Sequence, residues 1–414
     1  MKSLTLNFAN CIYEKNFVNG LKEKILLSTK MEKLCKKNII NKIHKSANFT
    51  DLPFKDKIEV SEIQLFGAKI SRLYSQFVLV GDENVISGIK SVFSFKKDVN
   101  NDVDDKTGQI KFDTVSSNNV DKLKLILEES DLTKTFFNFV LADESDIATL
   151  SLFSLTISKL KEVMKSEFFV NIVVTTQENN AVWKYSAENK INTLKFPKDI
   201  NEKYCSLSPV GLFPMAVLGL DLEKVLKGAK QILEDFKQED AKKSLSFATA
   251  LINYNFYKLK KRKVFLISKD KALHNFIKHF ENLLQDFNFE YSENIFMFLN
   301  TSKKKTNIKI PKLNDIIVLP KTFQELENIV YFATKQNLQK NQIPNYSLEI
   351  FDKTDETIGQ LLFFFELTSV IMQELFGIKS SDNFDIVSKE QTRLTLASPK
   401  KLKEKEKENF EIKI

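Results

Sequence analysis

The chain has 414 residues, of which 43% are hydrophobic and 28% charged, a composition typical of a globular protein with room for two or three domains. Its net charge of +8 is small for this length. Basic residues alternate with acidic ones, so the pattern favours a mixed, solvated surface over a nucleic-acid-binding one. We find no run of about 18 uncharged apolar residues and no signal-peptide layout, and we therefore expect no membrane span.

Cysteine and histidine are scarce and widely spaced. Cys11, Cys35 and Cys205 form neither a disulfide framework nor a zinc signature. His274 and His279 are five residues apart on an expected helix, which is the wrong spacing for a shared metal. We therefore expect a reducing, cytoplasmic location, with no metal and no cofactor.

The first half of the chain predicts a parallel sheet. Residues 1 to about 50 are polar-rich with a rough helical period, and we expect a helical arm. From about 60 to 195, buried strands alternate with helices, which indicates right-handed crossovers. The expected strands are 76–80, 135–141, 168–174 and 193–196, and the expected helices are 85–94 and 146–164.

The stretch from Ser206 to Ala229, SLSPVGLFPMAVLGLDLEKVLKGA, separates this half from the next. It holds Gly211, Gly219 and Gly228, three of only ten glycines. Where glycine is so scarce, we expect each one to lie where a side chain does not fit. The segment LDLEKVLKGA has the pattern of an amphipathic helix. Taken alone, the stretch fits a buried helix hairpin that joins two α/β units.

The second half repeats the alternation of strands and helices, followed by a charged tail from Pro399 that we expect to be exposed. The most apolar helix, 356–376, is expected to dock across both units. The expected helices are 244–257, 271–287, 323–337 and 356–376, and the expected strands are 263–268, 295–299, 315–319 and 347–350.

Two segments resemble signatures of the glucose-6-phosphate isomerase family. The stretch Ser206–Ala229 resembles its Ser-x-Val-Gly-Leu-x-Pro-x-Ala motif, and GQLLFFFELTSVIMQELFG resembles its Phe-Phe-Glu helix. The resemblance covers residues from about 75 to 395. It implies an α/β fold of two tandem sugar-isomerase-type (SIS) doubly wound parallel-sheet domains with helical N- and C-terminal segments. The implied boundaries are 1–55 for the arm, 56–200 and 201–350 for the two domains, and 351–414 for the C-terminal helices and tail.

The resemblance also implies an activity and partners. The family interconverts glucose 6-phosphate and fructose 6-phosphate in glycolysis and gluconeogenesis. A sugar phosphate is then the expected ligand and a homodimer the expected assembly. The chemistry needs an acid/base pair for ring opening, a carboxylate that moves a proton between C1 and C2, and a nearby cation. The phosphate needs backbone N–H groups and hydroxyls at a helix N-terminus.

The two loops expected to hold the sugar and its phosphate depart from the family. The family's Gly-x-Gly-Gly-Ser reads GDENV at 81–85, and its Ser-Lys-(Ser/Thr)-x-Thr-Thr loop reads LADESD at 141–146. Ser145 keeps one hydroxyl for substrate binding, whereas three carboxylates are added. Each carboxylate about 4 Å from a phosphate costs about 4 kcal/mol at an effective dielectric constant of about 20, before screening. Ser145 is alternatively a turn or N-cap residue.

The remaining catalytic positions carry shortened or altered side chains. Lys203 replaces the family's Arg near the reacting carbons, which keeps the charge and loses the planar fork. Asn282 and Asp286 replace Gln-x-x-x-Glu, so Asp286 is the candidate base, one methylene short. Lys389 lies near the family's last Lys and is a candidate substrate ligand. The alternatives are a solvated lysine at 203 and a surface acid at 286.

The family's catalytic His has no counterpart, because residues 300–305 read NTSKKK. His274 or His279 is a possible substitute acid or base, and Lys303–Lys305 are possible replacement phosphate ligands. Two functions therefore stay open. One is a divergent isomerase with Asp286 as base. The other is a non-catalytic descendant, a pseudoenzyme that binds or scaffolds other molecules and pairs with an active partner.

Overall fold

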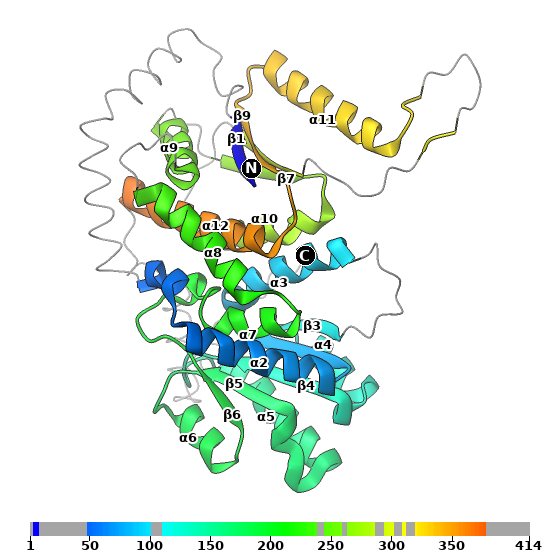
Figure 1. Cartoon of the computed structure of the whole chain (residues 1–414), viewed down its shortest axis with the longest axis vertical. Coiled ribbons are helices and arrows are strands. Elements are labelled where there is room, and N and C mark those ends of the chain that lie inside the picture. Colours follow the sequence, from blue (N-terminus) through cyan, green and yellow to red (C-terminus); the bar gives the residue numbers. More distant parts are fainter. Residues whose placement is uncertain are drawn as a thin grey trace, which may run out of the picture.

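The computed structural model describes residues 3–7, 48–100, 110–237, 244–258, 263–285, 294–301, 309–311 and 319–377. Two sheets lie at opposite ends of the molecule, with a layer of helices between them (Figure 1). The lower sheet in that view is formed by the first half of the chain. The upper sheet combines strands of the second half with the N-terminal residues.

The first sheet is fully parallel and has the strand order β3-β2-β4-β5-β6. Its central strands are short and completely buried, as expected for a parallel sheet covered on both faces. The chain leaves β2 toward β3 on one side and then places β4 on the other side of β2. The strands are β2 (Gln76–Gly81), β3 (Lys111–Ser116), β4 (Thr135–Val140), β5 (Ile172–Thr176) and β6 (Asn192–Lys195).

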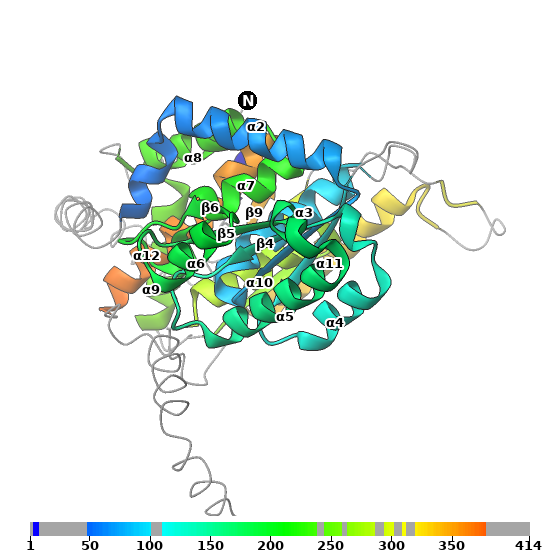
Figure 2. The same ribbon diagram turned by 90° about the horizontal axis from the view of Figure 1, so that it is seen from below.

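Alternate side chains of β2 explain how both faces of this sheet are covered. Phe77 and Leu79 point into the core shared with α2, α3 and α7. Val78 and Val80 point into a second core, formed with α4, α5 and α6. Figure 2 shows α2 and α5 on opposite sides of the sheet. The helices are α2 (Lys57–Leu73), α3 (Glu83–Asn100), α4 (Val120–Glu129), α5 (Ile147–Met164), α6 (Ala181–Glu188) and α7 (Pro209–Val217).

The second sheet has the order β1-β9-β8-β7. Strands β7, β8 and β9 are parallel, and the N-terminal strand β1 pairs antiparallel with β9. Helix α10 connects β7 to β8, and α11 precedes β9. The elements are β1 (Leu4–Asn7), β7 (Lys263–Ser268), β8 (Asn294–Thr301), β9 (Asn345–Ile350), α9 (Leu245–Lys258), α10 (His274–Leu283) and α11 (Phe323–Lys340).

Helix α12 (Asp355–Phe376) runs through the layer between the sheets and packs on α8 (Leu222–Lys237), α9 and α10. It is long and apolar enough to cross a membrane, but 83% of its apolar window is buried inside the protein. Its residues from Thr357 to Met372 are all buried. It is therefore a core helix, and the expectation that it docks across two separate units stays a prediction.

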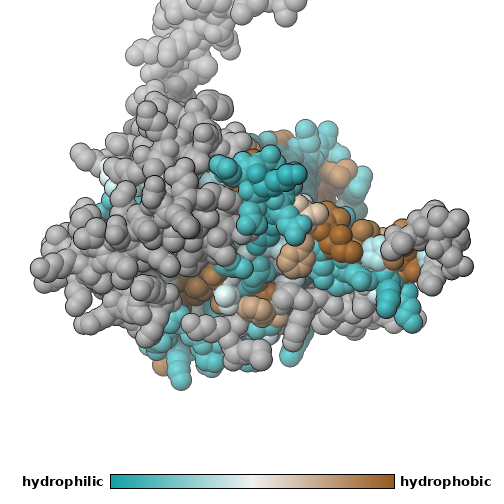
Figure 3. Space-filling view, turned by 90° about the horizontal axis from the view of Figure 1, so that it is seen from above, coloured by the Kyte–Doolittle hydropathy of each residue, from teal (hydrophilic) through white to brown (hydrophobic). Residues whose placement is uncertain are grey.

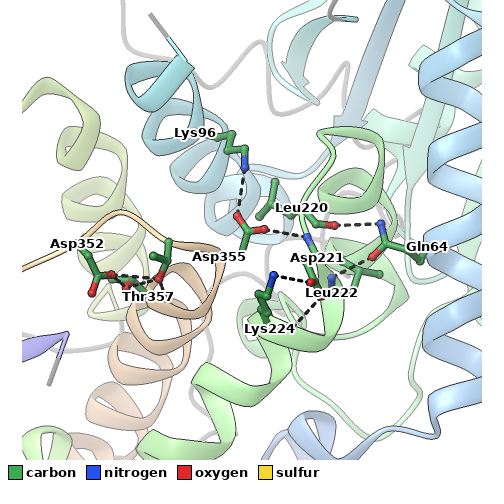
Figure 4. A network of polar contacts seen from close by, with 10 residues as sticks. Gln64, Lys96, Leu220, Asp221, Leu222, Lys224, Asp352, Asp355 and Thr357 are labelled. Atoms are coloured by element: carbon green, nitrogen blue, oxygen red, sulfur yellow. Dashed lines mark hydrogen bonds and ion pairs between the residues drawn. The ribbon is translucent and has the colours of Figure 1, made fainter. Parts of the chain in front are cut away.

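The turn that follows α7 is held by α2. Gly219 adopts a positive φ of 75°, which favours glycine. The side-chain amide of Gln64, on α2, forms hydrogen bonds with two residues that follow this glycine. Its Nε2 donates to the carbonyl of Leu220 at 3.0 Å, and its Oε1 accepts from the N–H of Leu222 at 3.0 Å (Figure 4). The sequence before α8 is thus fixed against the first sheet's outer helix.

The same turn is also tied to the start of α12. The Asp355 carboxylate accepts from the N–H of Asp221 at 2.9 Å and pairs with Lys96 of α3 at 3.2 Å (Figure 4). One carboxylate therefore links α3, α8 and α12, which come from distant parts of the sequence.

Most expected elements are present, and the α/β fold class with two mainly parallel sheets is confirmed. The strand expected at 168–174 is wrong over its first part, because Lys165–Asn171 form a 3-10 helix. Lys165 ends α5 with a positive φ of 52°. The Asn171 amide donates to the carbonyls of Leu132 and Thr135, so the strand begins only at Ile172.

Other differences between the expected and the observed elements concern strands at the edges of the two sheets. Leu4–Asn7 form a strand where a helical arm was expected, because the edge of β9 offers unpaired backbone groups. Strand β3 was not foreseen. Of the strand expected at 315–319, only Leu319 lies within the described residues, and it belongs to no strand. Residues 8–47 and the tail lie outside the described residues, and the proposed domain boundaries stay a prediction.

Candidate functional site

The first sheet changes the direction of its connections between β2 and β4. In open parallel sheets, ligands bind at the carboxyl ends of the strands where such a change occurs. Here the loops after β2 and β4, residues 81–84 and 141–146, lie at that place, since the two strands are paired from Gln76–Thr135 to Gly81–Val140. These are the same loops that the sequence assigns to the sugar and its phosphate.

Carboxylates of the chain itself occupy backbone N–H groups in both loops. Asp82 Oδ1 accepts from the N–H of Asn84 at 2.9 Å. Asp143 Oδ1 accepts from the N–H of Ser145 at 2.8 Å. Both contacts join a residue to the second residue after it, the geometry of an Asx turn. One backbone N–H group in each loop is thus already bonded to a carboxylate of the chain.

The N-terminus of α5 is closed in the same way. Asp146 is its N-cap residue and accepts from the N–H of Thr149 at 3.0 Å. Ser145 is half-buried, and its role as a phosphate ligand stays a prediction. The acidic turn therefore acts as a helix cap, as its sequence predicted.

Lys203 is a buried lysine, with only 4% of its surface exposed. It lies in the 3-10 helix Glu202–Tyr204, and its backbone N–H donates to Asn201 Oδ1 at 3.0 Å. The alternative of a solvated lysine is therefore wrong. The next residue, Tyr204, accepts from the Gln373 amide at 3.0 Å, which holds this segment against α12.

The other predicted site residues are only partly placed. Asn282 is half-buried near the end of α10 and accepts from the Gln285 amide at 3.3 Å. Asp286, Lys389 and Lys303–Lys305 lie outside the described residues. The structure therefore leaves the catalytic set a prediction. It does pack α3 against both α10 and the 3-10 helix that carries Lys203.

A buried polar cluster lies where these segments meet. We call Ser87, Ser206, His279 and Glu366 the inner polar cluster. Ser87 Oγ is 2.9 Å from His279 Nδ1. A Cβ atom at Gly88 would lie 2.4 Å from Ser206 Oγ and 3.4 Å from His279 Cε1, so α3, the Ser206 turn and α10 converge on one glycine.

Glu366 of α12 is the most unusual member of the inner polar cluster. It is fully buried, and neither of its carboxylate oxygens meets the geometry of a hydrogen bond with a described residue. Burial raises the pKa of Glu366 to about 8, although the nearby Ser206 acts in the opposite direction. The side chain is therefore mostly protonated at neutral pH.

His279 complements this by staying neutral. It is 1% exposed, and its Nε2 has no hydrogen-bond partner among the described residues. Burial lowers the pKa of His279 to about 4. The cluster thus holds a neutral acid and a neutral base, which are proton-transfer groups by type. Both are shielded from solvent, whereas His274 is exposed and lies 3.0 Å from the carbonyl of Ser268.

Sequence reasoning did not assign Glu366, Ser87 or Ser206 to a site. A signal for Glu366 is present, because it is the only charged residue between Leu361 and Met372. A lone carboxylate in such an apolar run is expected to be functional or specifically compensated. Ser87 and Ser206 carry no comparable signal. Within the described residues, no cluster of three or more His, Cys, Asp or Glu side chains is placed to hold a metal.

We compared the sequence and the structure with those of known proteins. No family model matches the sequence. Glucose-6-phosphate isomerase of Carboxydothermus hydrogenoformans is 20% identical across 88% of this chain and 88% of its own length. The enzyme of Bacillus cereus strain AH187 is 23% identical across 81% of this chain and 82% of its own. A crystal structure of glucose-6-phosphate isomerase from Chlamydia trachomatis covers 96% of this chain with a TM-score of 0.76 and 13% identity. The chain is therefore similar to glucose-6-phosphate isomerases over most of its length and shares the fold of one of them.

The chain shares its fold with a second solved structure as well. A hypothetical protein of Thermus thermophilus superimposes with a TM-score of 0.80, at 18% identity, over 95% of this chain and all of that one. The chain therefore shares this fold over nearly its whole length.

Proposed function

We propose that this divergent isomerase-family protein interconverts glucose 6-phosphate and fructose 6-phosphate weakly or not at all, and acts as a non-catalytic binding or scaffolding protein. One observation carries the proposal. In both loops at the carboxyl ends of β2 and β4, a carboxylate of the chain, Asp82 or Asp143, accepts from a backbone N–H group, which supports competition with a ligand anion.

Electrostatics supports the same conclusion. A phosphate dianion at the 141–146 loop would approach Asp143, Glu144 and Asp146. Asp146 is buried and Asp143 half-buried, so solvent screens their charges incompletely, whereas Glu144 is exposed and contributes less. At an effective dielectric constant of about 20, each contact near about 4 Å opposes binding by about 4 kcal/mol before screening. A single favourable hydroxyl at Ser145 does not offset this.

The positions assigned to catalysis support a loss of rate. Asp286 is one methylene shorter than the family's base, and a misplacement of about 1 Å can cost about a hundredfold in rate. Lys203 offers a point charge where the family has a planar, bidentate guanidinium. The buried His279 does not contact solvent and thus supports an internal role for its imidazole.

A second candidate is a divergent isomerase with Asp286 as base, and the burial of Lys203 favours it. Burying a lysine is costly unless its charge is compensated or used. A desolvated cation in the place of the family's Arg would stabilise an enediolate more strongly than a solvated one. In this case Lys303–Lys305 would replace the lost phosphate ligands.

The expected homodimer and cytoplasmic location belong to the proposal as well. A dimer of a non-catalytic protein would act as a scaffold by presenting two copies of the same binding surface. The cysteine content supports a reducing compartment.

Calorimetric titration with fructose 6-phosphate tests the proposed loss of the phosphate site. We expect no saturable binding to the wild-type protein at millimolar ligand. The variant Asp143→Asn/Glu144→Gln removes two charges and is expected to bind measurably better. Saturable wild-type binding that a folded Lys203→Met variant loses would support the divergent isomerase instead.

A further inference from the structure

The inner polar cluster belongs to the helix layer between the two sheets (Figure 1). The exterior seen from above shows hydrophilic residues beside hydrophobic ones (Figure 3). The four members of the cluster lie beneath the surface, since at most 3% of any of them is exposed. Whatever satisfies their polar groups must therefore be internal.

Glu366 lies on the side of α12 that faces the Tyr204 segment. The hydroxyl of Ser369 and the amide of Gln373 both donate to the Tyr204 hydroxyl, at 3.4 Å and 3.0 Å. Positions 366, 369 and 373 are separated by three and four residues, so they share one side of the helix. Ser206 is accordingly the polar residue next to the Glu366 carboxyl group.

Helix α10 brings His279 to the same place. The rings of Phe280 in α10 and Phe365 in α12 have centroids 4.8 Å apart, so the two helices are in contact one residue away from His279 and from the buried glutamate. A Cβ atom at Gly88 would lie 2.4 Å from Ser206 Oγ and 3.4 Å from His279 Cε1. Because Cε1 is bonded to Nε2, the imidazole edge that carries Nε2 lies close to Ser206.

The contacts of Ser87 determine which ring nitrogen of His279 carries the hydrogen. Ser87 Oγ is 2.9 Å from His279 Nδ1 and 3.3 Å from the carbonyl oxygen of Asn84. A serine hydroxyl has one hydrogen, and a carbonyl oxygen can only accept. Both contacts are therefore hydrogen bonds only if the hydroxyl donates to Asn84 and accepts from Nδ1–H. In this neutral tautomer, Nε2 has a lone pair and no hydrogen.

Glu366 and His279 thus carry complementary groups, and neither group has a hydrogen-bond partner in the part of the chain that the structure describes. Burial raises the pKa of Glu366, so its carboxyl group keeps a proton that it can donate, whereas the Nε2 lone pair can only accept. Buried polar groups are almost always bonded to protein or to ordered water. A molecule that accepts on one side and donates on the other would satisfy both.

We propose that the inner polar cluster binds one internal water molecule, which accepts from the Glu366 carboxyl group and donates to His279 Nε2. Ser206 Oγ is its third partner, and about three partners are usual for a buried water. The water links α12 to α10 and, through Ser87, to the loop after β2. It also holds the imidazole as an internal acceptor, so His279 is not available as an acid or base for a substrate. The site goes beyond the proposed function and does not depend on it.

A high-resolution crystal structure of the wild-type protein tests the site directly. We expect one isolated density peak at a hydrogen-bond distance of about 2.7–3.2 Å from both a Glu366 carboxyl oxygen and His279 Nε2. A direct hydrogen bond between Glu366 and His279 would overturn the proposal. The absence of a peak, or a peak that contacts only one of the two side chains, would overturn it as well.

Nitrogen-15 labelling of the imidazoles tests the same site in solution, because the chain has only three histidines. The spectrum of His279→Phe assigns the His279 signals by their loss. We expect the wild type to show the Nδ1–H tautomer at His279, with the Nε2 signal displaced from that of a free acceptor toward that of a hydrogen-bonded one. An Nε2–H tautomer would contradict the proposed water.

Substitutions of Glu366 test whether its proton is the source of that bond. Glu366→Leu removes the donor and should abolish the displacement of the His279 Nε2 signal, whereas Glu366→Gln retains an N–H donor and should keep it. Thr368→Val is the matched control, because the Thr368 hydroxyl donates within α12, and it should leave the signal unmoved. A displacement that persists in Glu366→Leu overturns the proposal. If this variant does not fold, the wild-type tautomer and density peak still decide.

Discussion

Gly228 of α8 and Gly359 of α12 lie at the crossing of the two helices, and each leaves no room for a side chain. A Cβ atom at Gly228 would lie 1.9 Å from the carbonyl oxygen of Glu356, and one at Gly359 would lie 1.8 Å from that of Val225. The close approach is reciprocal and involves backbone atoms on both helices. It explains why a chain so poor in glycine keeps one inside each of these helices.

Gly359→Ala is expected to destabilise the protein by about 2 kcal/mol or more, because the helices must move apart. Helix propensity alone would make the alanine variant more stable by about 1 kcal/mol. The sign of the change in the free energy of unfolding therefore shows whether the steric clash or the helix propensity dominates. Urea unfolding measures the difference. Glu223→Ala on the exposed face of α8 is the control and should change stability by less than about 0.5 kcal/mol. An unchanged midpoint for Gly359→Ala would mean that the crossing is looser than described.

Glu366→Gln is expected to change the pH dependence of stability. The folded pKa of Glu366 is raised to about 8, so the folded state keeps a proton that the unfolded state releases. Stability is therefore lost as the pH rises from the unfolded pKa of about 4.3 toward the folded one, by at most about 1.4 kcal/mol per pH unit. Gln removes this loss. The free energy of unfolding of the variant relative to wild type should rise between about pH 5 and about pH 8. A constant difference would contradict a protonated Glu366.

Asp270 is expected to show the opposite dependence. Burial works against its ionisation, but the Thr301 hydroxyl at 2.6 Å and Lys353 at 3.0 Å outweigh it, so the pKa of Asp270 is lowered. Its stabilisation is present above the unfolded pKa of about 3.9 and is lost as the pH falls through the folded value. Asp270→Asn should cost about 2–3 kcal/mol at neutral pH, with the cost shrinking in acid. A cost that stays equal in acid would exclude the ion pair as its cause.

Ser87 and His279 are expected to be coupled. Ser87→Ala leaves both ring nitrogens of the buried imidazole without a described partner and should cost about 1–3 kcal/mol. In His279→Phe, the same Ser87→Ala change should cost less. A double-mutant cycle by urea unfolding should give a coupling energy of about 0.5–1.5 kcal/mol. Additive effects would show that the 2.9 Å contact adds nothing to stability.

The sequence was sufficient to predict those helices and strands that are determined by residues close together in the chain. The buried strand at Gln76–Gly81 and the helix capped by Asp146 follow from hydrophobic runs and cap chemistry. Of the three glycines of the 206–229 stretch, Gly211 and Gly228 lie where a side chain does not fit, as expected. For Gly219 that expectation is wrong, because the space around it is open, and its positive φ is what favours glycine there. Strand β1 did not follow, because its conformation depends on the distant edge of β9.

The candidate site was predictable only in its loops. The acidic residues of 141–146 indicate a self-capped turn, and Asp143 and Asp146 confirm it. The burial of Lys203 could not be predicted, because it depends on packing by distant segments. Likewise, Glu366 lies beside Ser206 only once α12 has crossed the core.

Turnover of fructose 6-phosphate, read through glucose-6-phosphate dehydrogenase at high protein concentration, tests the central claim most directly. The account predicts a rate no greater than that of the Asp286→Asn variant. Wild-type turnover that disappears in the folded variant would contradict it, and would mean that the family's chemistry continues on a rebuilt phosphate site.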